Sequence, residues 1–154
     1  MIKNLTVNNS KQFKLNKPEI HRIISILKKE LDFQIYFMEI NIITSEEIHK
    51  INNQYLQHNY STDIITFNYS GENNTLDGEI FISLDDAYYN SLKYKVNLDN
   101  ELLRLIIHGF LHLVGYDDKE TNDKKKMKRI ENKLVNKLES SLKKIILKYE
   151  YKNS

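Results

Sequence analysis

Two histidines four residues apart stand in the most apolar stretch of the chain. Residues 108–118 read HGFLHLVGYDD. On a helix, His108 and His112 share one face one turn apart, so both imidazoles can bind one metal ion. Gly115 can adopt the left-handed conformation that reverses the chain, which lets Asp118 return to the same point. Three ligands leave a fourth position for water, as catalytic zinc sites require, and the spacing therefore predicts a metal centre.

The metal interpretation competes with two others. A lone histidine in an apolar helix is usually a core residue with one hydrogen bond, but two of them cost roughly a few kcal/mol to bury without partners. A metal ion offsets that cost. Zinc proteases of the H-E-x-x-H type place a glutamate, their general base, directly after the first histidine. Gly109 stands there in this chain, so a metalloprotease is a distant third possibility.

Alternating strands and helices are expected to position these residues. Period-two and β-branched patterns predict four strands, at residues 2–7, 34–43, 64–68 and 78–83. Capping residues such as Thr44 and Asn97, with apolar periodicity, predict five helices, at residues 18–31, 45–57, 84–94, 98–114 and 120–149. The expected fold class is α/β (α+β): a single small domain with one mixed sheet of about four strands, a buried metal-bearing helix and flanking helices.

The composition is that of one globular domain in a reducing compartment. The chain has 154 residues, 40% of them hydrophobic and 29% charged, and no cysteine, which excludes a disulfide scaffold and a thiolate zinc site. No run reaches the roughly 18 apolar residues that a membrane span needs, so we expect a cytoplasmic protein with no membrane partner. Residues 119–154 carry 12 Lys and Arg against 5 Asp and Glu. This basic segment either attracts polyanions or forms a solvated helix face.

Three stretches together resemble the YbeY-type rRNA maturation factor family. The run HGFLHLVGYDD is similar to the family signature H-G-x-L-H-L-x-G-Y-D-H. In the same order as in the family, TDIITF at 62–67 resembles T-D-V-L-S-F, and GEIFIS at 78–83 resembles G-D-I-x-I-S. The resemblance predicts a family domain over residues 1–139 and leaves residues 140–154 as a basic C-terminal helical extension.

The resemblance implies a metal-dependent endoribonuclease that is specific for single strands and uses one zinc ion. Such an enzyme would act in maturation of the small-subunit rRNA 3′ end and in ribosome quality control. Its partners would be single-stranded RNA, rRNA and the ribosomal small subunit, with no dinucleotide cofactor. A non-catalytic ribosome-assembly factor with a structural metal site is the alternative.

The signature carries the metal ligands over to His108, His112 and Asp118. The family has histidine where this chain has Asp118. A carboxylate is an acceptable zinc ligand, and it can also shift preference toward harder metals such as manganese. Asp117 matches the family's aspartate; it is the competing ligand candidate, and is otherwise expected just outside the ligand set.

A second departure from the family concerns catalysis. The family commonly has arginine in an N-x-x-[FY]-R-x-x-D stretch where this chain has Leu56, which cannot contact phosphate. Arg104 lies one turn before His108 and is the best candidate for a replacement catalytic cation. The competing interpretation is that Arg104 simply pairs with a carboxylate such as Glu101 or Asp99.

His58 is a weaker candidate for the same role. No general base is evident, because the sequence alone does not place Asp63, Glu79 or Asp117 beside the metal, although all three stand in family-matching stretches.

Overall fold

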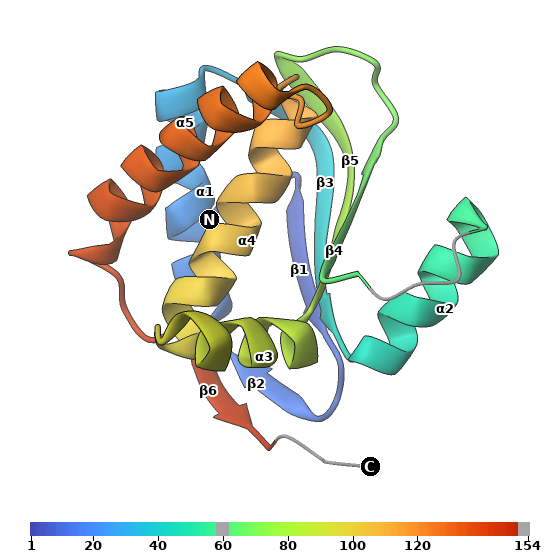
Figure 1. Cartoon of the computed structure of the whole chain (residues 1–154), viewed down its shortest axis with the longest axis vertical. Helices are drawn as coiled ribbons and strands as arrows, with labels where there is room; N and C mark the ends of the chain where they lie inside the picture. The colour runs from blue at the N-terminus through green and yellow to red at the C-terminus, as the bar shows by residue number, and fades with distance from the viewer. Residues whose placement is uncertain (58–61, 151–154) are drawn as a thin grey trace.

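A mixed four-stranded sheet lies at the centre of the fold (Figure 1). The structure is a computed structural model, and it describes residues 1–57 and 62–150. The strands, in their order across the sheet, are β1 (Leu5–Asn9), β3 (Gln34–Ile43), β5 (Thr75–Ser83) and β4 (Ile64–Asn68). β1, β3 and β5 are parallel, and β4 pairs antiparallel with β5. The predicted mixed sheet is confirmed, although β1 lies further along the chain than residues 2–7 and β5 begins at Thr75 instead of residue 78.

Within the described residues, five helices surround the sheet. They are α1 (Lys17–Leu31), α2 (Ser45–Leu56), α3 (Leu84–Tyr94), α4 (Leu98–Leu113) and α5 (Thr121–Glu139). Figure 1 shows α1, α4 and α5 on one side of the sheet and α2 on the other. The side chains of Thr44 and Asn97 accept backbone hydrogen bonds at the starts of α2 and α4, which confirms the predicted caps. In this part of the chain no helix is long and apolar enough to cross a membrane.

Helix α4 lies between the sheet and α5, with α3 packed against it as well. Ten of its 16 residues are buried, which confirms the prediction of a helix buried on nearly all sides. Gly109 allows a close approach to the sheet, because a Cβ there would lie 3.1 Å from both Ile64 Cδ1 and Ile80 Cδ1. A helix fixed between two layers holds its side chains more precisely than a loop does.

The C-terminal segment differs from the prediction. Helix α5 ends at Glu139, and β6 (Ile146–Tyr149) pairs antiparallel with β2 (Phe13–Leu15), a strand that the sequence pattern did not predict. The predicted helix over 120–149, and the helical character of the extension over 140–154, are therefore wrong for residues 140–149. Residues 151–154 lie outside the described residues.

Burial and backbone hydrogen bonding explain why this segment is extended. Ile145 and Ile146 are both buried in the main core. The backbone N–H of Ile146 donates to Asp99 Oδ1 at 3.0 Å, and that of Lys143 donates to Glu19 Oε2 at 2.8 Å. If α5 continued, these two N–H groups would bond to carbonyl groups within the helix; here they bond to side chains of α4 and α1 instead. The segment is part of the packed domain and not a solvated basic helix.

Candidate metal centre

His108, His112 and Asp118 come together at the C-terminal end of α4. The two Nε2 atoms are 3.1 Å apart, and His112 Nε2 lies 3.6 Å from Asp118 Oδ2. Gly115 reverses the chain after the helix with a φ of +106°, a conformation that other residues rarely adopt. One ligand atom from each of the three side chains lies within 4.8 Å of the other two.

The spacing and chemistry of these atoms fit one tetrahedral cation. Ligand atoms at ~2.0–2.2 Å from such an ion lie roughly 3.3–3.6 Å from one another, close to the two distances above. Burial, and after it the neighbouring His108, lowers the pKa of His112, which favours the neutral imidazole that a metal requires. Two imidazoles and a carboxylate could therefore hold a divalent cation and leave its fourth position open.

A buried glutamate on α5 orients His108, and the sequence analysis missed it. His108 Nδ1 donates to Glu131 Oε1 at 2.7 Å, and Glu131 is only 3% exposed. A proton on Nδ1 leaves the lone pair of Nε2 facing the candidate ligand cluster, the arrangement found in metal sites where a carboxylate supports a histidine. A signal was present in the sequence, because Glu131 stands between Met127 and Leu134 on the buried stripe of α5.

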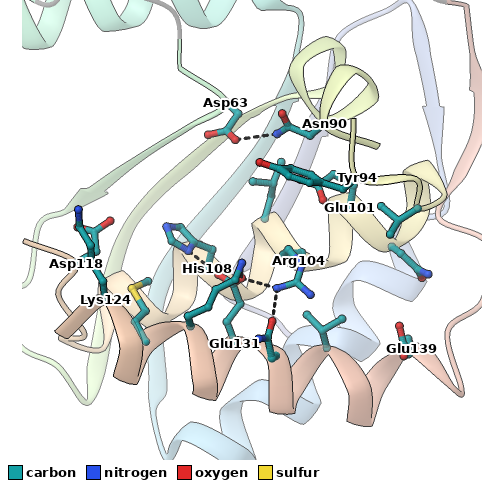
Figure 2. A pocket seen from close by; sticks show the side chains of 17 residues that line it. Asp63, Asn90, Tyr94, Glu101, Arg104, His108, Asp118, Lys124, Glu131 and Glu139 are labelled. Atoms are coloured by element: carbon teal, nitrogen blue, oxygen red, sulfur yellow. Dashed lines mark hydrogen bonds and ion pairs between the residues drawn. The ribbon is translucent and has the colours of Figure 1, made fainter. Parts of the chain in front are cut away.

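Three donors converge on the Glu131 carboxylate. Arg104 Nη1 donates to its Oε2 at 2.6 Å and Lys128 Nζ does so at 3.1 Å, in addition to the His108 contact (Figure 2). Burial acts to raise the pKa of Glu131, but the hydrogen bonds from His108 and Arg104 outweigh it and lower the pKa to about 2. The carboxylate is therefore ionised at neutral pH and links Arg104 to the candidate ligand cluster.

Arg104 is held in place while its side chain remains 30% exposed. Its Nη1 also donates to Asn132 Oδ1 at 2.8 Å. The interpretation that Arg104 pairs with a carboxylate is confirmed, but the partner is Glu131 on α5 instead of Glu101 or Asp99 on its own helix. Both hydrogen bonds use Nη1, so the three N–H donors on Nε and Nη2 can serve an anionic ligand.

A cavity of about 610 Å³ extends from the ligand cluster along α4 and α5 (Figure 2). His108 and Asp118 line one end, Arg104 lies in its middle part, and Tyr94 of α3 lies on the wall facing α5. Two of the three candidate ligands, His108 and Asp118, therefore line the same cavity as Arg104.

The three acidic residues of the family-matching stretches occupy different places. Asp63 lines the cavity and accepts a hydrogen bond from Asn90 Nδ2 at 3.0 Å. Glu79 accepts one from the Tyr69 hydroxyl at 3.3 Å, and burial raises its pKa. Asp117 accepts one from the backbone two residues later at 3.0 Å and lies outside the group of three candidate ligands. Of these acids, Asp63 is the one that shares the cavity with the cluster.

The structure shows where Leu56 and Gly109 lie, the two residues that depart from the family pattern and from the H-E-x-x-H protease pattern. Leu56 ends α2, on the other side of the sheet, and is not among the residues that line the cavity. His58, the weaker candidate, lies outside the described residues. Gly109 approaches Ile64 and Ile80 of the sheet, so a glutamate at this position would enter the core and not reach the cluster. The site therefore lacks the base of an H-E-x-x-H protease.

Comparison with known proteins shows relatives that are similar in sequence and a solved structure with the same fold. The model of a family described as Endoribonuclease YbeY matches residues 3–139. An endoribonuclease YbeY of Azobacteroides pseudotrichonymphae is 50% identical over 97 residues, 63% of this chain and 69% of that protein. One from Chlorobium phaeobacteroides is 36% identical over 127 residues, 82% of this chain and 89% of that protein. The solution structure of a Thermotoga maritima protein has the same fold, with a TM-score of 0.62 and 24% identity over 89% of this chain and 90% of that one.

Proposed function

The chain belongs to the endoribonuclease YbeY family, and from this premise we propose that it cuts single-stranded RNA at this metal centre during rRNA processing. The sequence-based prediction of a hydrolase acting on RNA is confirmed. The finer parts of the proposal are a zinc ion as cofactor, the 3′ end of the small-subunit rRNA as substrate, a role in ribosome quality control and a cytoplasmic location.

The metal centre would be formed by His108, His112 and Asp118. When bound, the cation supplies a more acidic water or a polarised phosphoryl oxygen. Glu131 keeps the proton on Nδ1 of His108 and so keeps Nε2 available. Arg104 offers its free donors to a phosphate, and a guanidinium fixed by a buried carboxylate is already oriented when charge develops there.

The observation that carries the proposal is the continuous cavity that His108 and Asp118 of the ligand cluster line together with the tethered Arg104. We expect purified protein to contain near one equivalent of divalent metal and to cleave single-stranded RNA but not a duplex of the same sequence. Chelation should abolish cleavage, and adding back zinc or manganese should show which ion restores it. His112→Ala should lose both metal and activity. His49→Ala, on the exposed face of α2, is the matched control and should keep both.

A non-catalytic assembly factor is the second candidate, because Leu56 replaces the arginine that the resemblance predicts. The same assays separate the two proposals. A wild-type protein that binds metal and rRNA but leaves single-stranded RNA intact would support the second and contradict the first. Cleavage that is lost in His112→Ala would support the first.

A further inference from the structure

The cavity continues well beyond the ligand cluster of His108, His112 and Asp118. Along α4, Arg104 lies one turn and Asn100 two turns before His108, and the eight helical steps from Asn100 to His108 span about 12 Å. Both Arg104 and Asn100 line the cavity, and Tyr94 at the end of α3 forms part of its wall. The cavity therefore reaches beyond the ligand cluster, and the part that Tyr94 borders is open to the rest of a bound strand.

Tyr94 is suited to contact a planar group. Its side chain is 60% exposed, and Figure 2 shows its ring over the cavity on the side across from α5. Lys93 Nζ lies 5.4 Å from the ring centroid, which places a positive charge beside the aromatic surface. Aromatic rings next to positive charges are the usual means by which proteins bind single-stranded nucleic acid.

The lining of the cavity combines apolar surface with amides. Val96 and Leu105 contribute apolar contact, and Asn100 and Asn132 contribute side-chain amides to the same lining. Asn132 uses its Oδ1 to accept from Arg104, so its NH₂ group can donate to a ligand. A flat ligand with polar edges, such as a nucleobase, fits this mixture better than an aliphatic or a purely anionic one.

We propose that Tyr94 is the stacking platform for an unpaired base of the RNA, one that neighbours the cleaved phosphate, with Asn100 and Asn132 beside the edge of that base. This inference rests on the proposed RNA cleavage and adds a specificity-determining residue to it. A base within a duplex is stacked on both faces and paired at its edge, so it cannot enter the cavity and stack on Tyr94. The platform would thus contribute to the preference for single strands.

Equilibrium binding of a short 2′-O-methylated single-stranded RNA, which resists cleavage, tests the inference on the full-length protein. A base stack is worth roughly 1–3 kcal/mol, so Tyr94→Ala should weaken binding by about 5- to 150-fold. Tyr94→Phe keeps the ring and should bind as the wild type does. Tyr89→Ala is the matched control, because Tyr89 lies on the same helix, is 52% exposed and does not line the cavity. Thermal melts of all variants verify that each is folded.

Moving one abasic nucleotide along the RNA locates the stacked base. At one position the abasic RNA should bind wild type and Tyr94→Ala equally, because the interaction is then missing on both sides. Wild-type affinity of Tyr94→Ala for every RNA would overturn the inference, and so would a loss of equal size wherever the abasic nucleotide stands. Cleavage of unmodified RNA by the wild type is measured in parallel. If that cleavage is absent, the proposed function fails; if it is present while Tyr94→Ala binds normally, only the stacking platform fails.

Discussion

Replacing Glu131 by glutamine should weaken metal binding without changing any ligand. Glutamine has nearly the same size and keeps one acceptor oxygen, but it puts an NH₂ group where the second carboxylate oxygen stood. Three donors, from His108, Arg104 and Lys128, converge on the native carboxylate, so at least one of them would face another donor. Glu131→Gln therefore leaves at least one donor unsatisfied around a buried side chain.

The size of the effect follows from these contacts. Removing a carboxylate that supports a metal-binding histidine typically lowers metal affinity by about 10- to 100-fold. For stability, hydrogen bonds to charged groups contribute roughly 1.5–3 kcal/mol each. The Lys128 side chain is 62% exposed, so its pair adds little. We therefore expect Glu131→Gln to lower the free energy of unfolding of the metal-free protein by about 2–3 kcal/mol, mostly through His108 and Arg104.

Two measurements check this prediction. Competition with a chromophoric chelator gives the metal affinity, and urea unfolding of the chelated protein gives the stability. Glu139→Gln makes the same chemical change at an exposed position of the same helix and should alter neither. Wild-type metal affinity and stability in Glu131→Gln would refute the role assigned to this carboxylate, since they would mean that His108 is oriented without it.

Three further predictions concern other contacts. Two hydrogen bonds from Arg22, both at 2.7 Å, hold the pKa of Glu19 below its ordinary value of 4.5. The ionised Glu19 therefore stabilises the fold above pH 4.5, and this stabilisation is lost as the pH falls through the lowered pKa. In urea unfolding, Glu19→Gln should have a free energy of unfolding about 1–3 kcal/mol lower at neutral pH, and that free energy should fall less steeply as the pH is lowered. An unchanged dependence of stability on acid pH would contradict the pairing of Glu19 with Arg22. Ile145→Ala should lower the free energy of unfolding by about 2–5 kcal/mol, because Ile145 is fully buried; a loss under about 0.5 kcal/mol would mean that the C-terminal segment is not packed as described. Arg104→Gln should lower the rate constant of RNA cleavage by roughly 10²–10³-fold, and a full cleavage rate would remove Arg104 from the mechanism; elemental analysis should show its metal content retained.

Local patterns made the grouping of the three candidate ligands predictable. His108 and His112 are related by one helical turn, and Gly115 and Asp118 follow within six residues, so short-range geometry was enough to group the three side chains. The helix caps at Thr44 and Asn97 are local in the same sense.

Features that depend on distant contacts could not be predicted in this way. Glu131 reaches His108 across 23 residues, and only the docking of α5 on α4 brings the two together. The end of α5 at Glu139 was missed because the following residues keep a helical pattern, whereas the burial of Ile145 and Ile146 decides their conformation. β2 has only three residues, and its pairing with β6 gives it a structure that its own sequence does not signal.

The dependence of His108 on Glu131 also sets the order in which the centre is completed during translation. A ribosome delivers the chain from its N-terminus, so His108, His112 and Asp118 all emerge before Glu131. Until α5 has emerged and docked, a nascent chain carries every ligand but lacks the carboxylate that fixes the first imidazole. The candidate centre is therefore finished late in synthesis, and a chain released before α5 would hold its three candidate ligands without the contact that orders His108.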